Sequence, residues 1–241
     1  RPQNNFQVDF GGVIATRSIS NIFLGLNYYY FNRSLTHFEA NFSTGDFYKS
    51  AHVKSRIDLP NRGQFYIEPV ATFNKWDFFQ GNDLVVKSTS PTALNRIDRK
   101  IGLNIGIPVG NRYKLELGGA YINNRDQYVN NDVLVSTDTL DILNVRGGRT
   151  GISLATNTLN RKQYASEGKR FAFSFDVFSL TETLEPGNTS VKTESEKTGH
   201  NFFRAKVSLE QYFLKGVFST GYFVEGVLSN QDSFSSYTAS I

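Results

Sequence analysis

The stretch Arg99-Lys-Ile-Gly-Leu-Asn-Ile-Gly-Ile-Pro-Val-Gly-Asn-Arg-Tyr-Lys-Leu-Glu-Leu-Gly-Gly-Ala-Tyr-Ile122 decides the fold. In its first half, an Ile or Leu at every second position from Ile101 to Ile107 alternates with glycine and asparagine. The second half repeats this alternation from Tyr113 to Tyr121. A short polar turn, 109–112, lies between the halves. Two runs of period two joined by a Gly-Asn turn predict a β-hairpin with one apolar face.

The same alternation recurs along the chain and predicts about eleven strands and no amphipathic helix. The alternating segments are 6–10, 22–30, 38–42, 53–59, 65–73, 101–107, 113–121, 152–156, 171–177, 203–209 and 218–228. Pro69 cannot donate to a ladder, so we expect a bulge there. Two all-β architectures fit this pattern: a soluble sandwich with a buried apolar face, and an antiparallel up-and-down transmembrane β-barrel that turns its apolar face to lipid.

The connections favour the barrel. Those at 31–34, 60–63, 109–112 and 214–216 are very short, whereas the polar stretches 80–94, 124–140 and 185–200 are long. In an up-and-down sheet, alternate connections lie at the same end, so one end has tight turns and the other long loops. This asymmetry is typical of outer-membrane barrels, whose periplasmic turns are short and whose extracellular loops are long. The stretch 157–168 is a longer connection at the short-turn end.

A barrel assigns each strand residue to lipid or lumen. The polar residues predicted to face a hydrated lumen are Lys54, Arg56, Asp58, Glu68, Asn104, Lys114, Glu116, Asp176, Arg204, Lys206 and Glu210. The residues predicted to face lipid are Leu103, Ile105, Leu115, Leu117, Phe173 and Phe175. The aromatic residues predicted at the membrane interfaces, where amphipathic rings are enriched, are Tyr28, Tyr30, Trp76, Phe78, Phe79 and Tyr212.

Composition excludes several other functions. The chain has 241 residues, no cysteine and no methionine, so no thiol nucleophile or thiolate metal site is possible. The missing initiator leads us to expect that a signal peptide or a larger N-terminal region has been removed. No apolar run reaches the length of a transmembrane helix. The net charge of +4 is spread along the chain, without the basic and aromatic cluster that nucleic-acid binding needs.

Candidate catalytic and metal-binding residues are weak. Ser219 in Gly216-Val-Phe-Ser-Thr-Gly221 has one residue too many before it for a nucleophile elbow and lies in a strand pattern. The histidines His37, His52 and His200 are scattered, and two of them fall on polar faces. The sequence therefore predicts no catalytic residue, no metal site and no cofactor.

Four short motifs carry a resemblance to a known family. They are Asn157-Thr-Leu-Asn-Arg-Lys-Gln-Tyr-Ala-Ser-Glu-Gly168 with the following strand to Phe175, Tyr66-Ile-Glu-Pro69, Trp76-Asp-Phe-Phe79 and Ser136-Thr-Asp-Thr-Leu-Asp141. The first resembles a strand–turn–strand element of the Omp85 (surface antigen) superfamily of outer-membrane barrels. Together the four resemble the C-terminal barrel of Bacteroidota patatin-like phospholipases.

The resemblance implies a barrel of about sixteen strands that follows a periplasmic patatin hydrolase domain and a small POTRA-type domain. No family catalytic residue can be placed on this chain. Val145-Arg146-Gly147 matches the family's Val-Arg-Gly-Phe signature only superficially, because Gly148 replaces the aromatic residue.

These observations predict that residues 1–241 are the N-terminal portion of an outer-membrane barrel domain, ending in a long extracellular loop. Its expected partners are outer-membrane lipid and outer-membrane or periplasmic proteins, and not nucleic acid. The expected role is membrane anchor or translocation pore for a patatin-like lipase domain. Two alternatives stay open: the barrel of an outer-membrane protein assembly factor, and a soluble all-β binding module. We expect the strand 5–12, which ends in Gly11-Gly12, to be a sheet edge that closes against a final strand of the parent barrel.

Overall fold

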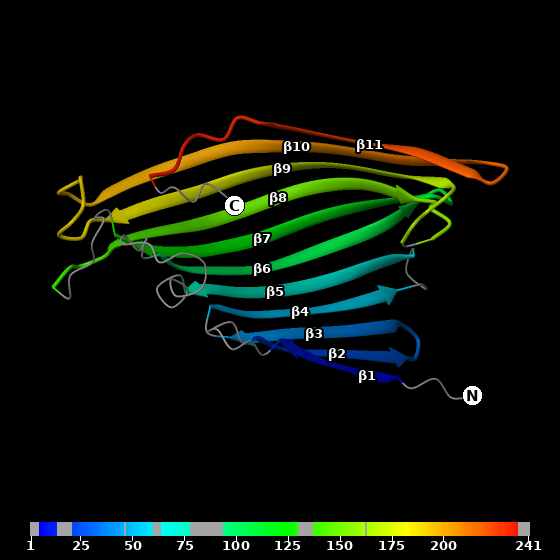
Figure 1. Cartoon of the computed structure of the whole chain (residues 1–241), viewed down its shortest axis with the longest axis horizontal. Helices are drawn as coiled ribbons and strands as arrows, with labels where there is room; N and C mark the ends of the chain where they lie inside the picture. The colour runs from blue at the N-terminus through cyan, green and yellow to red at the C-terminus, as the bar shows by residue number, and fades with distance from the viewer. Residues whose placement is uncertain are drawn as a thin grey trace.

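The computed structural model describes residues 5–13, 21–45, 47–59, 64–77, 94–129, 137–161 and 163–235. Eleven strands form one antiparallel meander in which each strand pairs with the next along the chain (Figure 1). They are β1 (Phe6–Val13), β2 (Asn21–Phe31), β3 (Leu35–Gly45), β4 (Tyr48–Leu59), β5 (Phe65–Asp77), β6 (Leu94–Val109), β7 (Tyr113–Tyr128), β8 (Asp141–Asn157), β9 (Gly168–Glu185), β10 (Glu196–Lys215) and β11 (Phe218–Ser229). The predicted all-β, up-and-down antiparallel topology is confirmed. Among the described residues there is no helix with the length and hydropathy to cross a membrane.

The sheet curves, and the ladder register assigns each residue to its concave or convex face. Directly paired residues share a face, and successive residues of a strand alternate between faces. Glu39 pairs with Lys54 on the concave face, and Ile105 pairs with Leu117 on the convex face. The same register connects neighbouring strands from β1 to β11, so the two faces can be followed across the whole sheet.

The two ends of the sheet differ as predicted. At the short-turn end, tight turns join β6 to β7 and β10 to β11, and Gly110 and Gly216 have φ of 60° and 63°. Glycine adopts this left-handed conformation without the steric cost that a side chain brings. At the long-loop end, β7 is followed by residues 129–140 and β9 by residues 186–195 before the next strand begins.

Strand lengths depart from the prediction at the long-loop end. Strands β7 to β10 have 16, 17, 18 and 20 residues, whereas a membrane β-strand needs about 9–11. Part of the stretches 124–140 and 185–200, which the sequence assigned to loops, is therefore strand, because β7 continues to Tyr128 and β10 begins at Glu196. These four strands extend well past the alternating segments found in the sequence.

The hydrophobic core lies in this extension, on its concave face. Ile122, Leu143, Val145, Phe178 and Phe202 are among the buried members of one cluster, and Phe234, which follows β11, packs against it. Phe178 stacks on Phe202 with ring centroids 4.6 Å apart. The core is thus built from β7 to β10, where the strands are longest.

The expected bulge at Pro69 is not formed. The β4–β5 ladder pairs Lys54 with Val70, is interrupted, and resumes at Ile57 and Ile67 in the same register. On its other side Pro69 pairs with Leu103. The missing proline donor therefore interrupts one ladder without the extra residue that defines a bulge.

Candidate functional site

The concave face carries most of the charged side chains of the sheet. All eleven polar residues that the sequence assigned to a lumen lie on it, as the ladder register shows. Residues of opposite charge are often directly paired there, including Glu39 with Lys54 and Asp176 with Arg204. Because cross-strand neighbours of opposite charge attract, this face compensates its own charges.

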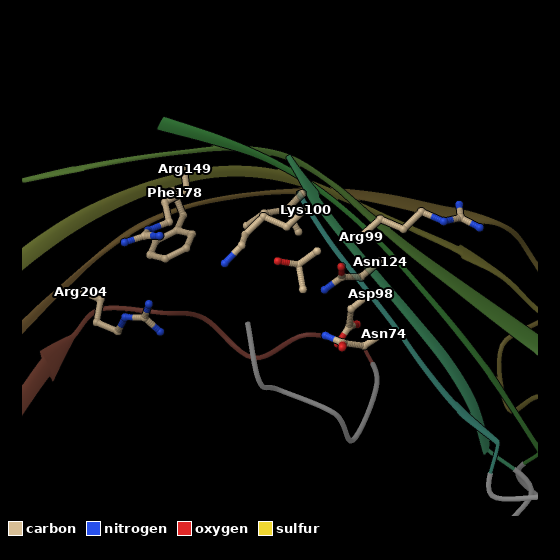
Figure 2. Close-up of a pocket in the computed structure, with 10 residues that line it drawn as sticks. Asn74, Asp98, Arg99, Lys100, Asn124, Arg149, Phe178 and Arg204 are labelled. Carbon is tan, nitrogen blue, oxygen red and sulfur yellow. The ribbon is translucent and has the colours of Figure 1, made fainter. Parts of the chain in front are cut away.

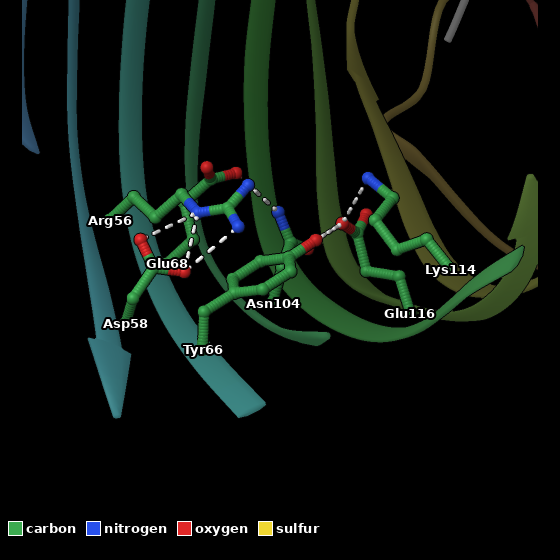
Figure 3. Close-up of polar contacts among 7 residues, drawn as sticks. All are labelled: Arg56, Asp58, Tyr66, Glu68, Asn104, Lys114 and Glu116. Atoms are coloured by element: carbon green, nitrogen blue, oxygen red, sulfur yellow. Dashed lines mark hydrogen bonds and ion pairs between the residues drawn. The ribbon is translucent and has the colours of Figure 1, made fainter. Parts of the chain in front are cut away.

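One polar network lies near the short-turn end, across β4 to β7 (Figure 3). The Arg56 guanidinium bonds the Asp58 carboxylate at 2.8 Å and lies 3.9 Å from the centroid of the Tyr66 ring. The Tyr66 hydroxyl donates to the Glu116 carboxylate, which also pairs with Lys114 at 3.1 Å. Five side chains from three strands, β4, β5 and β7, are thus held together by charge-assisted hydrogen bonds and a cation–π contact.

A glycine makes room for this network. Gly106 pairs directly with Tyr66, and a Cβ atom at Gly106 would lie 2.0 Å from the Tyr66 ring. The ring therefore lies over the bare backbone of β6, which lets its hydroxyl reach Glu116. Any side chain at position 106 would displace the ring.

A second network surrounds Asp176, which is 4% exposed. Arg149 donates to its Oδ1 from Nε at 2.9 Å and from Nη2 at 2.6 Å. The Arg204 Nη2 is 3.7 Å from the other carboxylate oxygen, and its guanidinium lies over Phe178 at 5.1 Å. This network borders a hollow into which Lys100 also points (Figure 2).

The candidate catalytic and metal-binding side chains of the described residues take part in structural contacts. Among the described residues, no three His, Asp or Glu side chains come together as a metal site would require. Ser219 lies at the short-turn end of β11, and its hydroxyl donates to the Ser166 carbonyl at 3.0 Å. His37 stacks on Tyr29, and His52 bonds Thr72, so each has a structural partner. The two concave networks pair opposite charges along the inner face of the curved sheet.

The convex face carries a continuous apolar band. All six residues that the sequence assigned to lipid lie on it. On β7 the band runs from Tyr113 to Tyr121, with Leu117, at its centre, 48% exposed. Eight residue steps at about 3.4 Å each give about 27 Å along the strand, and a stretch of about nine residues is the length that a tilted membrane β-strand needs.

The edges of the band shift between β5 and β10. On β5 the band runs from Phe65 to Phe73, and on β10 it runs from Phe203 to Phe213. Followed across the ladders, the row of Phe73 reaches Gly199 on β10, and Phe203 lies four residues closer to the short-turn end. A band of fixed height crosses tilted strands in this way, since strand tilt is required to close a barrel.

The aromatic residues predicted at the interfaces divide between the faces. Tyr28 and Tyr30 lie on the convex face at the short-turn end. Trp76 lies on the concave face, where the Arg96 guanidinium is 5.8 Å from its ring. Tyr212 is also concave, packed so closely over Gly221 that a Cβ there would be 2.4 Å from the ring. Placement at the end of a strand does not determine the face, which depends on parity. Phe78 and Phe79 lie outside the described residues.

Sequence reasoning missed a buried polar pair in the concave core. His200 Nε2 lies 2.6 Å from Glu182 Oε2, and their side chains are 4% and 2% exposed. Phe234 lies over the His200 ring at 4.2 Å, and the Ser235 amide donates to Glu182 Oε1 at 2.8 Å. The segment after β11 therefore folds back over the core. In the sequence, the two residues were related only by the alternation of neighbouring strands, which places both side chains on the same face.

The longer connection at the short-turn end is itself ordered by hydrogen bonds. Asn160 Oδ1 accepts from the Ser166 and Glu167 amides, and the Thr158 amide donates to the Lys169 carbonyl at 2.8 Å. This is the stretch that carries the main family resemblance. It extends the β8–β9 pairing into a compact turn.

Comparison with known proteins shows which solved structure has a similar fold. The crystal structure of BamA from Haemophilus ducreyi lacking POTRA domains 1–3 is similar over 97% of this chain, with a TM-score of 0.62 and 14% sequence identity. The chain has a BamA-like barrel fold. It spans 42% of the length of that BamA chain. No protein-family model and no curated protein matches the chain.

The likeness to BamA agrees with the fold of the Omp85 superfamily that the sequence motifs resemble. Because the sequence identity is 14%, this likeness shows a similar fold and nothing about function. The association with a patatin lipase has no counterpart in the comparisons and is taken up below as a proposal.

Proposed function

We propose that this chain is the N-terminal part of an outer-membrane β-barrel, with its convex face in contact with lipid and its concave face lining a hydrated interior. The observation that carries this proposal is an inversion of polarity along β7 to β10. In the band, the convex face is apolar and the concave face polar. Past the band, the convex residues are Asn123, Arg125, Thr181 and similar polar ones, while the concave residues form the buried core.

A single environment does not account for this inversion. A water-soluble sheet with one buried face would keep the same face apolar along its whole length. A sheet that leaves the bilayer meets lipid on its convex face only within the membrane and water on that face beyond it. The inversion thus favours a membrane barrel over the soluble binding module.

The two edges of the sheet support closure by further strands. Among the described strands, β1 pairs only with β2, and β11 only with β10. Unpaired backbone groups at both edges would be costly in lipid, and the family resemblance implies about sixteen strands. The short β1, with Gly11 and Gly12 near its end, suits the seam at which first and last strands meet.

Within the parent protein, the proposed role is a membrane anchor or translocation pore for a patatin-like lipase domain, with no enzymatic activity in this segment. The four sequence motifs support this role. The likeness to BamA favours a second candidate, the barrel of an outer-membrane assembly factor. A lipase assay on the parent protein separates the two: activity is expected for the first candidate, should survive Ser219→Ala, and should be absent for the second.

The membrane placement is testable by single-cysteine labelling, because the chain has no native cysteine. Cysteines replace Leu103, Leu117 and Phe175 on the convex face, and Asn104, Ser153 and Ser174 on the concave face. In phosphatidylcholine vesicles, a water-soluble maleimide should label the concave set and leave the convex set protected.

Two results would overturn the placement. One is equal labelling of the two sets. The other is a compact monomer that stays in solution without detergent, which would support the soluble module instead.

A further inference from the structure

A belt of cations lies on the convex face just beyond the apolar band, on the long-loop side. It consists of one residue from each of five neighbouring strands, β4 to β8: Lys49, Lys75, Arg99, Arg125 and Arg146. The register places Lys49 opposite Lys75 and places Arg146 opposite Asn123. Arg125 lies two residues after Asn123, so it is in the next convex row of paired residues toward the long-loop end. These two ladder rows contain no carboxylate on strands β4 to β10.

The cations of the belt lack the carboxylate partners that compensate the cations of the concave face. Concave cations such as Lys54, Arg149 and Arg170 have carboxylate partners at 2.9, 2.6 and 2.6 Å. In the belt, Lys75 has a partner in Asp77 at 3.7 Å. The other four have no hydrogen bond or ion pair with any described residue.

Like charges placed directly opposite each other destabilise a sheet, and Lys49 and Lys75 are so placed. An anion held between them would remove that penalty. The belt therefore has the charge pattern of a surface whose counter-charges come from outside the chain.

The position of the belt indicates where those counter-charges come from. Phe73 and Tyr121, the last apolar residues of the band on β5 and β7, are 36% and 53% exposed. Arg99 lies two positions before Ile101, on the long-loop side of it, and its side chain extends away from Lys100, which points into the hollow (Figure 2). On β5 and β7 the order is apolar band, aromatic ring, cation, which matches hydrocarbon, interface and headgroup region.

We propose that this belt binds the phosphate groups of lipid headgroups in the leaflet at the long-loop end. The inference rests on the proposed membrane-spanning function. Guanidinium groups bind phosphate oxygens through paired hydrogen bonds, and the spacing of neighbouring strands, about 4.8 Å, lets two cations share one phosphate.

The test compares a belt variant with a matched control in the parent protein, purified in a neutral detergent. The belt variant is Arg99→Gln, Arg125→Gln and Arg146→Gln. The control is Arg33→Gln, Arg112→Gln and Arg161→Gln, which removes the same charge from exposed turns at the short-turn end. Native mass spectrometry measures bound lipid A, which carries phosphate monoesters, against bound phosphatidylcholine at equal concentrations.

The wild type and the control should prefer lipid A, and the belt variant should lose about fivefold of that preference per cation, or about 100-fold in all, at low salt. An equal loss in the control, or no preference in the wild type, would overturn the belt. If the belt variant does not fold, the salt dependence of the wild type is the test. The wild type's preference for lipid A must fall as the salt concentration is raised, and a preference that does not change with salt counts against the proposal. Insertion of the wild type into pure phosphatidylcholine vesicles is measured in parallel; failure there would refute the membrane function itself.

Discussion

Arginine at Leu117 gives the most direct energetic test of the two faces. Leu117 lies at the centre of the convex band of β7, directly opposite Ile105 and Ile152, and it is 48% exposed. If the convex face contacts lipid, this exposure is to hydrocarbon. Leu117→Arg then places a guanidinium near the bilayer midplane, whereas in a solvated sheet the same side chain would face water.

The expected cost follows from the position of Leu117 in the band. The band on β7 ends four residues away on either side, at Tyr113 and Tyr121, which is about 14 Å along the strand. An arginine side chain is too short to bring its charge to either interface over that distance. The full midplane cost of about 2–4 kcal/mol therefore applies, a reduction of about 30-fold to 1,000-fold in the folding equilibrium constant.

The assay is urea unfolding of the parent protein in phosphatidylcholine vesicles. Leu117→Ala controls for the lost leucine. Ser153→Arg is the matched control on the concave face, where Ser153 pairs directly with Glu116, and it should change the free energy of unfolding by less than about 1 kcal/mol. A larger loss for Ser153→Arg than for Leu117→Arg would mean that the faces are reversed. No loss for either would remove the convex face from the membrane.

Three further predictions concern the concave face. Gly106→Ala should lower the free energy of unfolding by about 1–3 kcal/mol, because the new methyl group displaces the Tyr66 ring. Gly119→Ala is the control and should be neutral, since a Cβ there would have no neighbour closer than 4.0 Å. Equal costs for the two variants would contradict the ring packing. In a double-mutant cycle, Asp176→Asn and Arg149→Gln should couple by about 1–3 kcal/mol, and strict additivity would show that the 2.6 Å contact contributes nothing. Phe234→Ala should speed proteolysis at 230–235 without changing maleimide protection of the band, since Phe234 packs against the concave core; unchanged proteolysis would refute its role in holding that segment.

Much of the sheet was predictable because one rule governs the membrane-sized part of each strand. Alternation from Ile101 to Ile107 and from Tyr113 to Tyr121 fixed both the strands and the assignment of Leu103 and Asn104 to opposite faces. Pairing of neighbours along the chain then followed from the short turns. The faces of Trp76 and Tyr212 were not predicted, because their interfacial position was argued from strand ends while parity places both rings on the concave side.

The strand extensions could not be recognised by the same rule. In β8 the residues from Asp141 to Arg149 keep the parity of the strand but exchange the polarity of its faces. A search for apolar residues on the face set by Ile152 and Leu154 therefore stops at the band, and the polar convex residues beyond it look like loop. The strand continues because backbone pairing depends on neighbouring strands and not on which side is apolar.

The position of the exchange has a physical consequence for the interior. Inside the band, the concave side chains are charged and paired, such as Arg170 with Glu210 at 2.6 Å. Beyond it, Leu143 and Phe178 are 2% and 1% exposed, so they are packed out of contact with water. Such a core needs a cover, and Phe234 supplies part of it from the segment that follows β11. The extended strands therefore fold as a water-soluble sheet does, around a core of their own, while the same strands have their apolar side outward a few residues closer to the short-turn end. On β7 the exchange falls between Tyr121 and Ile122, next to the ladder row that joins Asn123 to Arg146 of the cation belt.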